Sequence, residues 1–303
     1  MNWILIALAA YLLLALSYVI DKFILSGRVP EPSVFAFYVA VLSFATIFLV
    51  PFGFYWPGIG TALEAAVSGA LYIYAVLFLY KAVKVNEISR VSPLVFAVTA
   101  SATVFISIVF LDEKLTFLNF NGLFFLIAGG LLISFDLPIK SKKIFNGFYN
   151  SMLAGILFAL AYAIAKNVYG DSAFINGYVM TRAGIFLGGL GLLLIPEYKK
   201  QIFSSLQNIK KDKKKNMATA SIIIGSKALG GGFTILLNYA IFLGNISVVN
   251  AMASAQFVFI LIFSGLASLK FPKLFGEKLF FWDWFQKIAA IFIIGLGIFL
   301  IYD

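Results

Sequence analysis

The sequence predicts an all-α integral membrane protein in which ten transmembrane helices form two inverted repeats of five helices. Hydrophobic residues make up 62% of the 303 residues and charged residues only 12%, a balance that leaves too little polar surface for a water-soluble domain. The apolar residues fall into runs near the ~20 residues that an α-helix needs to cross a bilayer. Short stretches of the first half recur in the second half.

The residue types that are missing narrow the chemistry. The chain contains neither cysteine nor histidine, so thiolate chemistry is excluded and the commonest general base and metal ligand is absent. We therefore expect no enzyme, no metal and no cofactor. The net charge of +10 does not predict a nucleic-acid partner, because an excess of lysine in a membrane protein usually reports its orientation.

The hairpin at residues 86–134 sets the pattern for the spans. Its two apolar runs are joined by the charged turn Asp112, Glu113 and Lys114, and apolar residues occupy every face of both runs, unlike a soluble helix. Runs bounded by charge, Pro or Gly give ten predicted spans in all. They are 3–25, 34–51, 61–80, 91–111, 118–135, 149–169, 174–195, 217–243, 248–269 and 286–302.

One connection, residues 196–216, is long and rich in lysine. It places Tyr198, Ile202, Leu206 and Ile209 at helical spacing. Two interpretations fit this pattern: an amphipathic helix in the headgroup region, or a solvated linker that only fixes the topology.

Lysine and arginine are distributed unevenly between the two sides. Connections after odd-numbered spans hold 19 of these residues, whereas the other face holds two, Lys114 and Lys166. The positive-inside rule therefore predicts that both termini lie outside. The remaining two cations, Arg182 and Lys227, fall within apolar runs.

Similarity between the halves predicts a duplication. Residues 15–22 read ALSYVIDK and residues 159–166 read ALAYAIAK, while NEIS at 86–89 corresponds to GNIS at 244–247. We assign the first repeat to residues 1–143 and the second to 144–303. Because five spans is an odd number, the second repeat enters the membrane from the opposite side, and such repeats place a binding site near the bilayer midplane.

These residues resemble the drug/metabolite transporter superfamily, specifically its EamA-type members. The resemblance rests on two units of five spans, on Ser-Pro-Leu at 92–94 and Leu-Asp-Glu-Lys-Leu at 111–115, and on a Gly-containing fifth span. The second half departs from it, since Ala251 stands where the first half has Pro93. The resemblance implies cytoplasmic termini, contrary to the lysine count, and a central cavity lined by spans 1, 3, 4, 6, 8 and 9.

Two Tyr-Lys pairs recur in the repeats. Tyr18 and Lys22 are four residues apart and share a helix face, as do Tyr162 and Lys166. We expect them to line opposite sides of a central site. Alternatively, the lysines extend to the headgroups and the tyrosines belong to an interfacial belt.

Lys227 is the stronger candidate for substrate binding, since it lies about ten residues into its span and precedes three glycines. A cation at that depth costs several kcal/mol and indicates function. The alternative is a lysine that is neutral or bonded to backbone carbonyls. Arg182 is a lesser candidate, expected within a turn or two of the surface. The resemblance adds Thr99, Asn238 and Gln256, for which helix packing is the competing interpretation.

The expected function is that of a secondary transporter in the plasma membrane, which moves a small polar or anionic metabolite such as an amino acid by alternating access. The expected partners are a small-molecule substrate and membrane lipids, and the chain is a monomer or a homodimer. A flippase for a lipid-linked substrate is the main alternative. An intramembrane enzyme and a non-transporting scaffold are the others.

Overall fold

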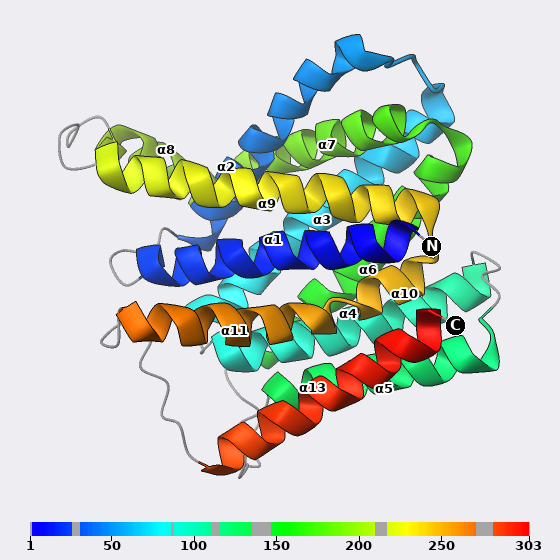
Figure 1. Ribbon diagram of the computed structural model, residues 1–303. Helices are drawn as coiled ribbons and strands as arrows, with labels where there is room; N and C mark the ends of the chain where they lie inside the picture. The colour runs from blue at the N-terminus through cyan, green and yellow to red at the C-terminus, as the bar shows by residue number, and fades with distance from the viewer. Residues whose placement is uncertain are drawn as a thin grey trace. The chain divides into compact units, whose positions relative to one another are not determined.

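The computed structural model describes residues 2–25, 31–85, 88–110, 115–134, 147–209, 217–270 and 281–302. Within these ranges every regular element is a helix (Figure 1). The elements are α1 (Asn2–Leu25), α2 (Pro32–Ser43), η1 (Phe44–Phe52), α3 (Ile59–Val85), α4 (Ile88–Phe110), α5 (Phe117–Ser134), α6 (Phe148–Asp171), α7 (Phe174–Gly191), η2 (Leu192–Leu194), α8 (Pro196–Ile209), α9 (Met217–Leu243), α10 (Ile246–Ala251), α11 (Ser254–Lys270) and α13 (Phe281–Tyr302).

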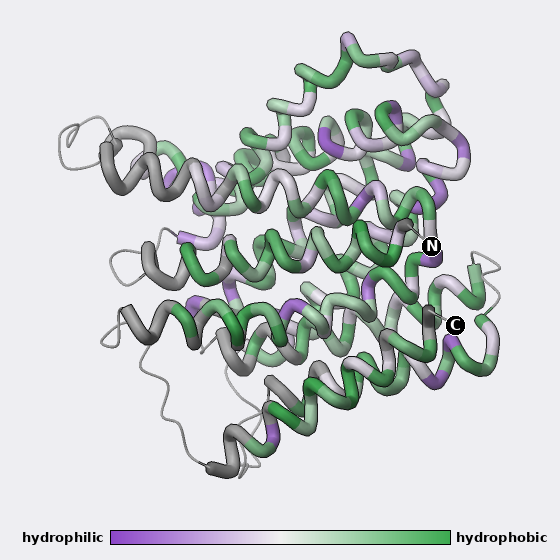
Figure 2. Tube along the Cα trace, viewed as in Figure 1, coloured by the Kyte–Doolittle hydropathy of each residue, from purple (hydrophilic) through white to green (hydrophobic). Residues whose placement is uncertain are grey.

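Four helical stretches of the described chain are long and apolar enough to cross a membrane. They are Pro32–Phe52, Ile59–Ala82, Phe148–Asp171 and Phe174–Leu194. Apolar residues cover the helices along most of their length (Figure 2), and large ones such as Phe48 and Phe117 are exposed. A helical protein that presents such surfaces belongs to the all-α membrane class.

Three predicted spans of the described chain differ from a single α-helix. The run 174–195 forms α7 and then the short 3₁₀ helix η2. The run 34–51 begins as α2 and tightens after Ser43 into the 3₁₀ helix η1, which contains Pro51. The run 248–269 is divided into α10 and α11. Elsewhere in the described chain the predicted runs correspond to helices within a few residues.

The helices form two compact units. Unit 1 comprises Met1–Val29, Lys114–Lys143 and Lys214–Asp303, and unit 2 comprises Pro30–Glu113 and Ile144–Lys213. In unit 1, α1 packs on α9 and α11, and α5 pairs with α13. In unit 2, α6 packs on α3 and α4, and α2 pairs with α7. Each unit therefore combines helices from residues 1–143 with helices from residues 144–303.

The helices α3 of unit 2 and α9 of unit 1 have the same length, and each makes a serine contact with a neighbouring helix. The helices α3 and α9 each have 27 residues, and α9 begins 158 residues after α3 (217 against 59). The same offset separates the starts of α4 and α10 (88 against 246). In unit 2 the Ser68 hydroxyl donates to the carbonyl of Ala161 at 2.8 Å. In unit 1 the Ser226 hydroxyl donates to the carbonyl of Ser17 at 3.4 Å.

Small residues bring α3 and α7 close together in unit 2. A Cβ at Gly188 would lie 2.8 Å from the Cα of Ala70, and one at Gly69 or Gly184 would meet backbone atoms of the facing helix inside 3.0 Å. Glycines spaced four residues apart allow the backbones of two membrane helices to approach closely. Such helices associate through van der Waals packing, because lipid supplies no hydrophobic driving force between them. The contact positions the middle of α7 against α3.

Candidate functional site

Arg182 lies near the middle of the 21-residue candidate span Phe174–Leu194. Its side chain is only 6% exposed. The guanidinium carbon lies 4.9 Å from the ring centroid of Tyr178 on the same helix and 5.6 Å from that of Tyr72 on α3. Tyr162 and Tyr169 of α6 contribute two further phenol groups close to the charge. We call Arg182 with these four tyrosines the Arg182 cluster.

The positive charge of this cluster is not neutralised by a carboxylate among the described residues. The rings of Tyr72 and Tyr178 stabilise it through their π faces. Among the described residues, nevertheless, the buried Nε of Arg182 has no hydrogen-bond partner. A guanidinium has five N–H donors, and leaving one buried and unsatisfied costs about 1–3 kcal/mol. The Tyr72 side chain bonds to the guanidinium, so the acceptor that is missing is the one for Nε.

Local sequence explains how the cluster forms. Gly177 admits the ring of Tyr169, whose Cε1 would lie 2.8 Å from a Cβ at that position. The Thr181 hydroxyl donates a hydrogen bond of 2.8 Å to the carbonyl of Gly177, one turn earlier on α7. On α3, the bond from Ser68 to Ala161 fixes α3 against α6 one turn before Tyr72. These contacts place tyrosines from three helices around one guanidinium.

Three half-buried aromatic rings border the buried charge. The rings of Phe158 and Tyr162 are stacked with centroids 6.1 Å apart. Tyr72 meets both edge-on, at 5.4 Å from Phe158 and 6.2 Å from Tyr162. A carboxylate or phosphate that reached Arg182 would supply the missing acceptor through a charge-assisted hydrogen bond. The arrangement suits anion binding.

Unit 1 contains a helix break beside buried polar groups. An α-helix would pair the Ala253 amide with Val249, but this amide donates to Asn250 at 3.2 Å. The carbonyl of Val249 that is released accepts instead from the Tyr11 hydroxyl of α1 at 3.0 Å. Likewise the carbonyl of Ala251 accepts from the Ser254 hydroxyl at 3.0 Å. The tighter turn persists because side chains satisfy the freed carbonyls.

The structure brings some predicted site residues together. Arg182 and Tyr162 lie in one cluster in unit 2. Lys166 is half-buried one turn further along α6 and makes an interaction of its own. The Arg182 side chain is buried within the protein, while its distance from the membrane surface stays a prediction.

Other predicted residues serve packing or lie in the other unit. Thr99 donates its hydroxyl to the carbonyls of Val95 and Gly155, which joins α4 to α6 and supports the packing interpretation. In unit 1, Asn238 is buried and donates to the carbonyl of Thr234 at 2.7 Å. Gln256 is buried directly after the helix break.

Three predicted side chains, those of Tyr18, Lys22 and Lys227, lie outside the part of the chain that the structure describes. Their backbones belong to α1 and α9. The helix α9 continues without a break through residues 230–232, so the three glycines after Lys227 do not end it.

Sequence reasoning missed Tyr11, Tyr72, Tyr169 and Tyr178. Tyrosine in an apolar run is commonly assigned to an interfacial belt. Tyr72 lies well inside its candidate span, so its depth is the signal that could have identified it, whereas Tyr178 lies only about one turn from the start of its span. Depth could not have identified Tyr11, because the carbonyl that its hydroxyl contacts, that of Val249, is free only where the helix breaks after α10.

Comparison with known proteins shows a similar fold. No family model matches the chain, and no curated protein matches it. A solved structure described as "Crystal structure of protein" is similar, with a TM-score of 0.65 at 12% sequence identity. The match covers 99% of this chain and 96% of that chain. At this identity the likeness concerns the fold.

Proposed function

We propose that the protein is a multi-pass secondary transporter of the plasma membrane, similar to EamA-type drug/metabolite transporters, that carries a small anionic metabolite by alternating access. The observation that carries the proposal is Arg182, a buried cation without a carboxylate partner in the described chain. Such a charge within a span is expensive and marks substrate pathways. An anionic substrate would complete its hydrogen bonding.

The proposed mechanism uses ten spans arranged as two inverted repeats. The equal lengths of α3 and α9 and the common offset of 158 residues (217 against 59, 246 against 88) support a duplication. The recurrent serine contacts, Ser68 to Ala161 and Ser226 to Ser17, support it too. Carriers built from inverted repeats expose a midplane site alternately by moving one part against another.

The site chemistry favours a carboxylate-bearing substrate such as an amino acid. Arg182 would hold the carboxylate, and Tyr72 and Tyr162 would contact the remainder through ring faces and hydroxyls. A cationic drug would meet an uncompensated positive charge and is disfavoured. A phosphate ester accepts hydrogen bonds from the same N–H donors of Arg182, so phosphorylated metabolites should be tested together with carboxylates.

Thermal unfolding of the purified protein tests the proposal. We expect some carboxylates or phosphate esters to raise the melting temperature of the wild type, whereas their amide or alcohol analogues do not. A ligand at 100 times its Kd stabilises the folded state by about 2.7 kcal/mol. Arg182→Gln should remove this shift.

Two further variants separate binding from folding. Tyr72→Phe retains the ring and should weaken the shift, while Lys84→Gln removes a cation that already pairs with Glu31 and should leave it unchanged. A shift that persists in a folded Arg182→Gln protein would refute the assigned site. A shift caused by lipid phosphates alone would favour the flippase.

A further inference from the structure

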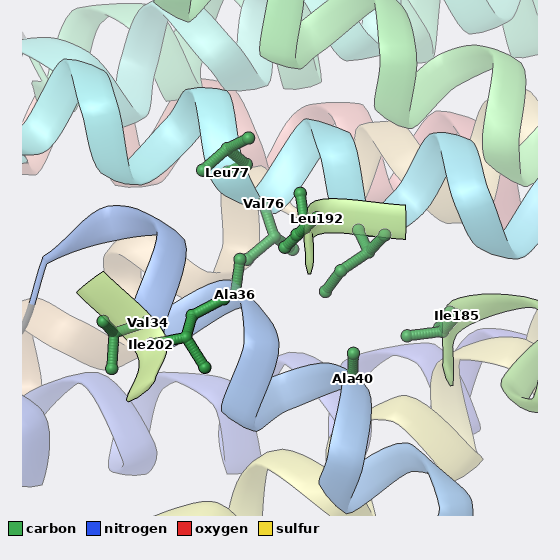
Figure 3. Packing of buried hydrophobic residues seen from close by; sticks show 9 residues of the cluster. Val34, Ala36, Ala40, Val76, Leu77, Ile185, Leu192 and Ile202 are labelled. Atoms are coloured by element: carbon green, nitrogen blue, oxygen red, sulfur yellow. The ribbon is translucent and has the colours of Figure 1, made fainter. Parts of the chain in front are cut away.

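The helix α8 has two faces with different surroundings. Its inner face buries Ile202, which is 1% exposed, in a cluster with Val34 of α2 (Figure 3). Tyr198 packs against the same cluster. Its outer face exposes Lys199, Lys200 and Phe203, the last 49% exposed. We call these three residues the outer face of α8.

Polar contacts fix the inner face to unit 2. Gln201 accepts a hydrogen bond from Ser33, and Ser205 is 3.2 Å from the hydroxyl of Tyr38. Tyr198 accepts a bond from Lys81 of α3. An isolated amphipathic helix would bury its apolar face in lipid, but α8 packs that face against α2 and its neighbours in unit 2. The residues left for other partners are therefore those of the outer face.

The position of α8 along the chain places it at the level of a membrane surface. The candidate span Phe174–Leu194 ends one residue before Ile195, and α8 begins at Pro196. At ~1.5 Å per residue, a helix that begins so close to the end of a span starts in the headgroup region. The partner of its outer face is consequently expected among headgroups.

Charge and residue type identify the kind of headgroup. Lys199 and Phe203 are four residues apart, and Lys200 and Phe203 three apart, so a helix presents them together. Five more lysines follow in the sequence at 210, 211, 213, 214 and 215, against the acids Glu197 and Asp212. Clustered lysines beside an aromatic residue recognise anionic lipid surfaces.

We propose that the outer face of α8 is a docking site for anionic phospholipid headgroups. Lys199 and Lys200 contact the phosphates, and Phe203 enters the boundary between headgroups and acyl chains. Because α8 is bonded to α2 and α3, lipid bound there also stabilises unit 2. This proposal needs only a membrane location and does not depend on transport.

Thermal unfolding in detergent tests the site with two lipids of equal chain length, phosphatidylglycerol and phosphatidylcholine. We expect phosphatidylglycerol to raise the melting temperature more than phosphatidylcholine, and more strongly at low salt. The double variant Lys199→Gln, Lys200→Gln should need roughly fivefold more phosphatidylglycerol, for each lysine removed, to reach the same rise in melting temperature. Lys84→Gln, which removes a paired cation, should not.

A positional measurement tests the same site independently of stability. The chain has no cysteine, so Ser204→Cys carries a single fluorophore on the exposed side of α8. Brominated lipids should quench it more in phosphatidylglycerol vesicles than in phosphatidylcholine vesicles, and the double lysine variant should lose the difference. Equal responses to the two lipids in both experiments, or equal loss in Lys84→Gln, would overturn the proposal.

Discussion

Replacing Gly69 with alanine should separate α3 from α7. An added Cβ would meet three backbone atoms of α7 inside 3.0 Å, from Thr181, Gly184 and Ile185. Ordinary contacts begin at 3.4 Å, and backbone atoms cannot rotate away as a side chain can. The helices must therefore move apart. Overpacking of this kind costs about 1–3 kcal/mol.

The variant should also disturb the Arg182 cluster. Arg182 lies between Thr181 and Gly184 on α7, so a displacement of that helix moves the guanidinium relative to Tyr72, which lies 5.6 Å away. Loss of anion binding should accompany the loss of stability. Both effects have one cause.

The assay is unfolding in mixed detergent micelles, followed by tryptophan fluorescence and compared with a matched variant. Gly60→Ala lies in the same helix and has no atom within 4 Å of the added Cβ, so it should be neutral or slightly stabilising, given the higher helix propensity of alanine. If Gly69→Ala unfolds at the same denaturant concentration as Gly60→Ala, the close α3–α7 contact is wrong.

Three further outcomes follow from particular contacts. Tyr11→Phe should speed amide exchange at residues 250–256 several-fold, since a freed carbonyl loses about 1 kcal/mol of bonding; unchanged exchange would contradict the role given to Tyr11. Ser68→Ala should lower the free energy of unfolding by about 0.6 kcal/mol, measured in the same micelles, and no change would remove Ser68 from the helix contact. Arg182→Met should keep or raise the melting temperature while anion binding disappears, because an apolar residue avoids the cost of the buried charge; strong destabilisation would indicate a structural arginine.

The positions of the helices could be predicted because the solvent leaves few alternatives. In lipid, an apolar run of ~20 residues must satisfy its backbone within one helix. The run 174–195 accordingly became α7 and η2, and 217–243 became α9. Helical spacing in 196–216 allowed an amphipathic helix as one of two interpretations, and residues 196–209 form α8. Periodicity could not show that Ile202 packs on protein rather than in lipid.

The helix break and the Arg182 cluster depend on contacts that are distant in sequence. No Pro or Gly marks residues 250–256, and the break is stabilised by Tyr11, a residue of α1. Similarly, four tyrosines meet Arg182 from α3, α6 and α7. The position of a charged residue within an apolar run predicts the free-energy cost of burying its charge. The side chains that surround the charge depend on how the helices pack, which one run does not show.

Counterflow in proteoliposomes tests the central claim most directly. Vesicles preloaded with a mixture of unlabelled amino acids and dicarboxylates are supplied outside with the radiolabelled mixture. An alternating-access carrier should accumulate label faster in preloaded than in empty vesicles, and Arg182→Gln should abolish the difference. Equal uptake by preloaded wild-type, Arg182→Gln and protein-free vesicles would contradict a carrier of small anions built around Arg182.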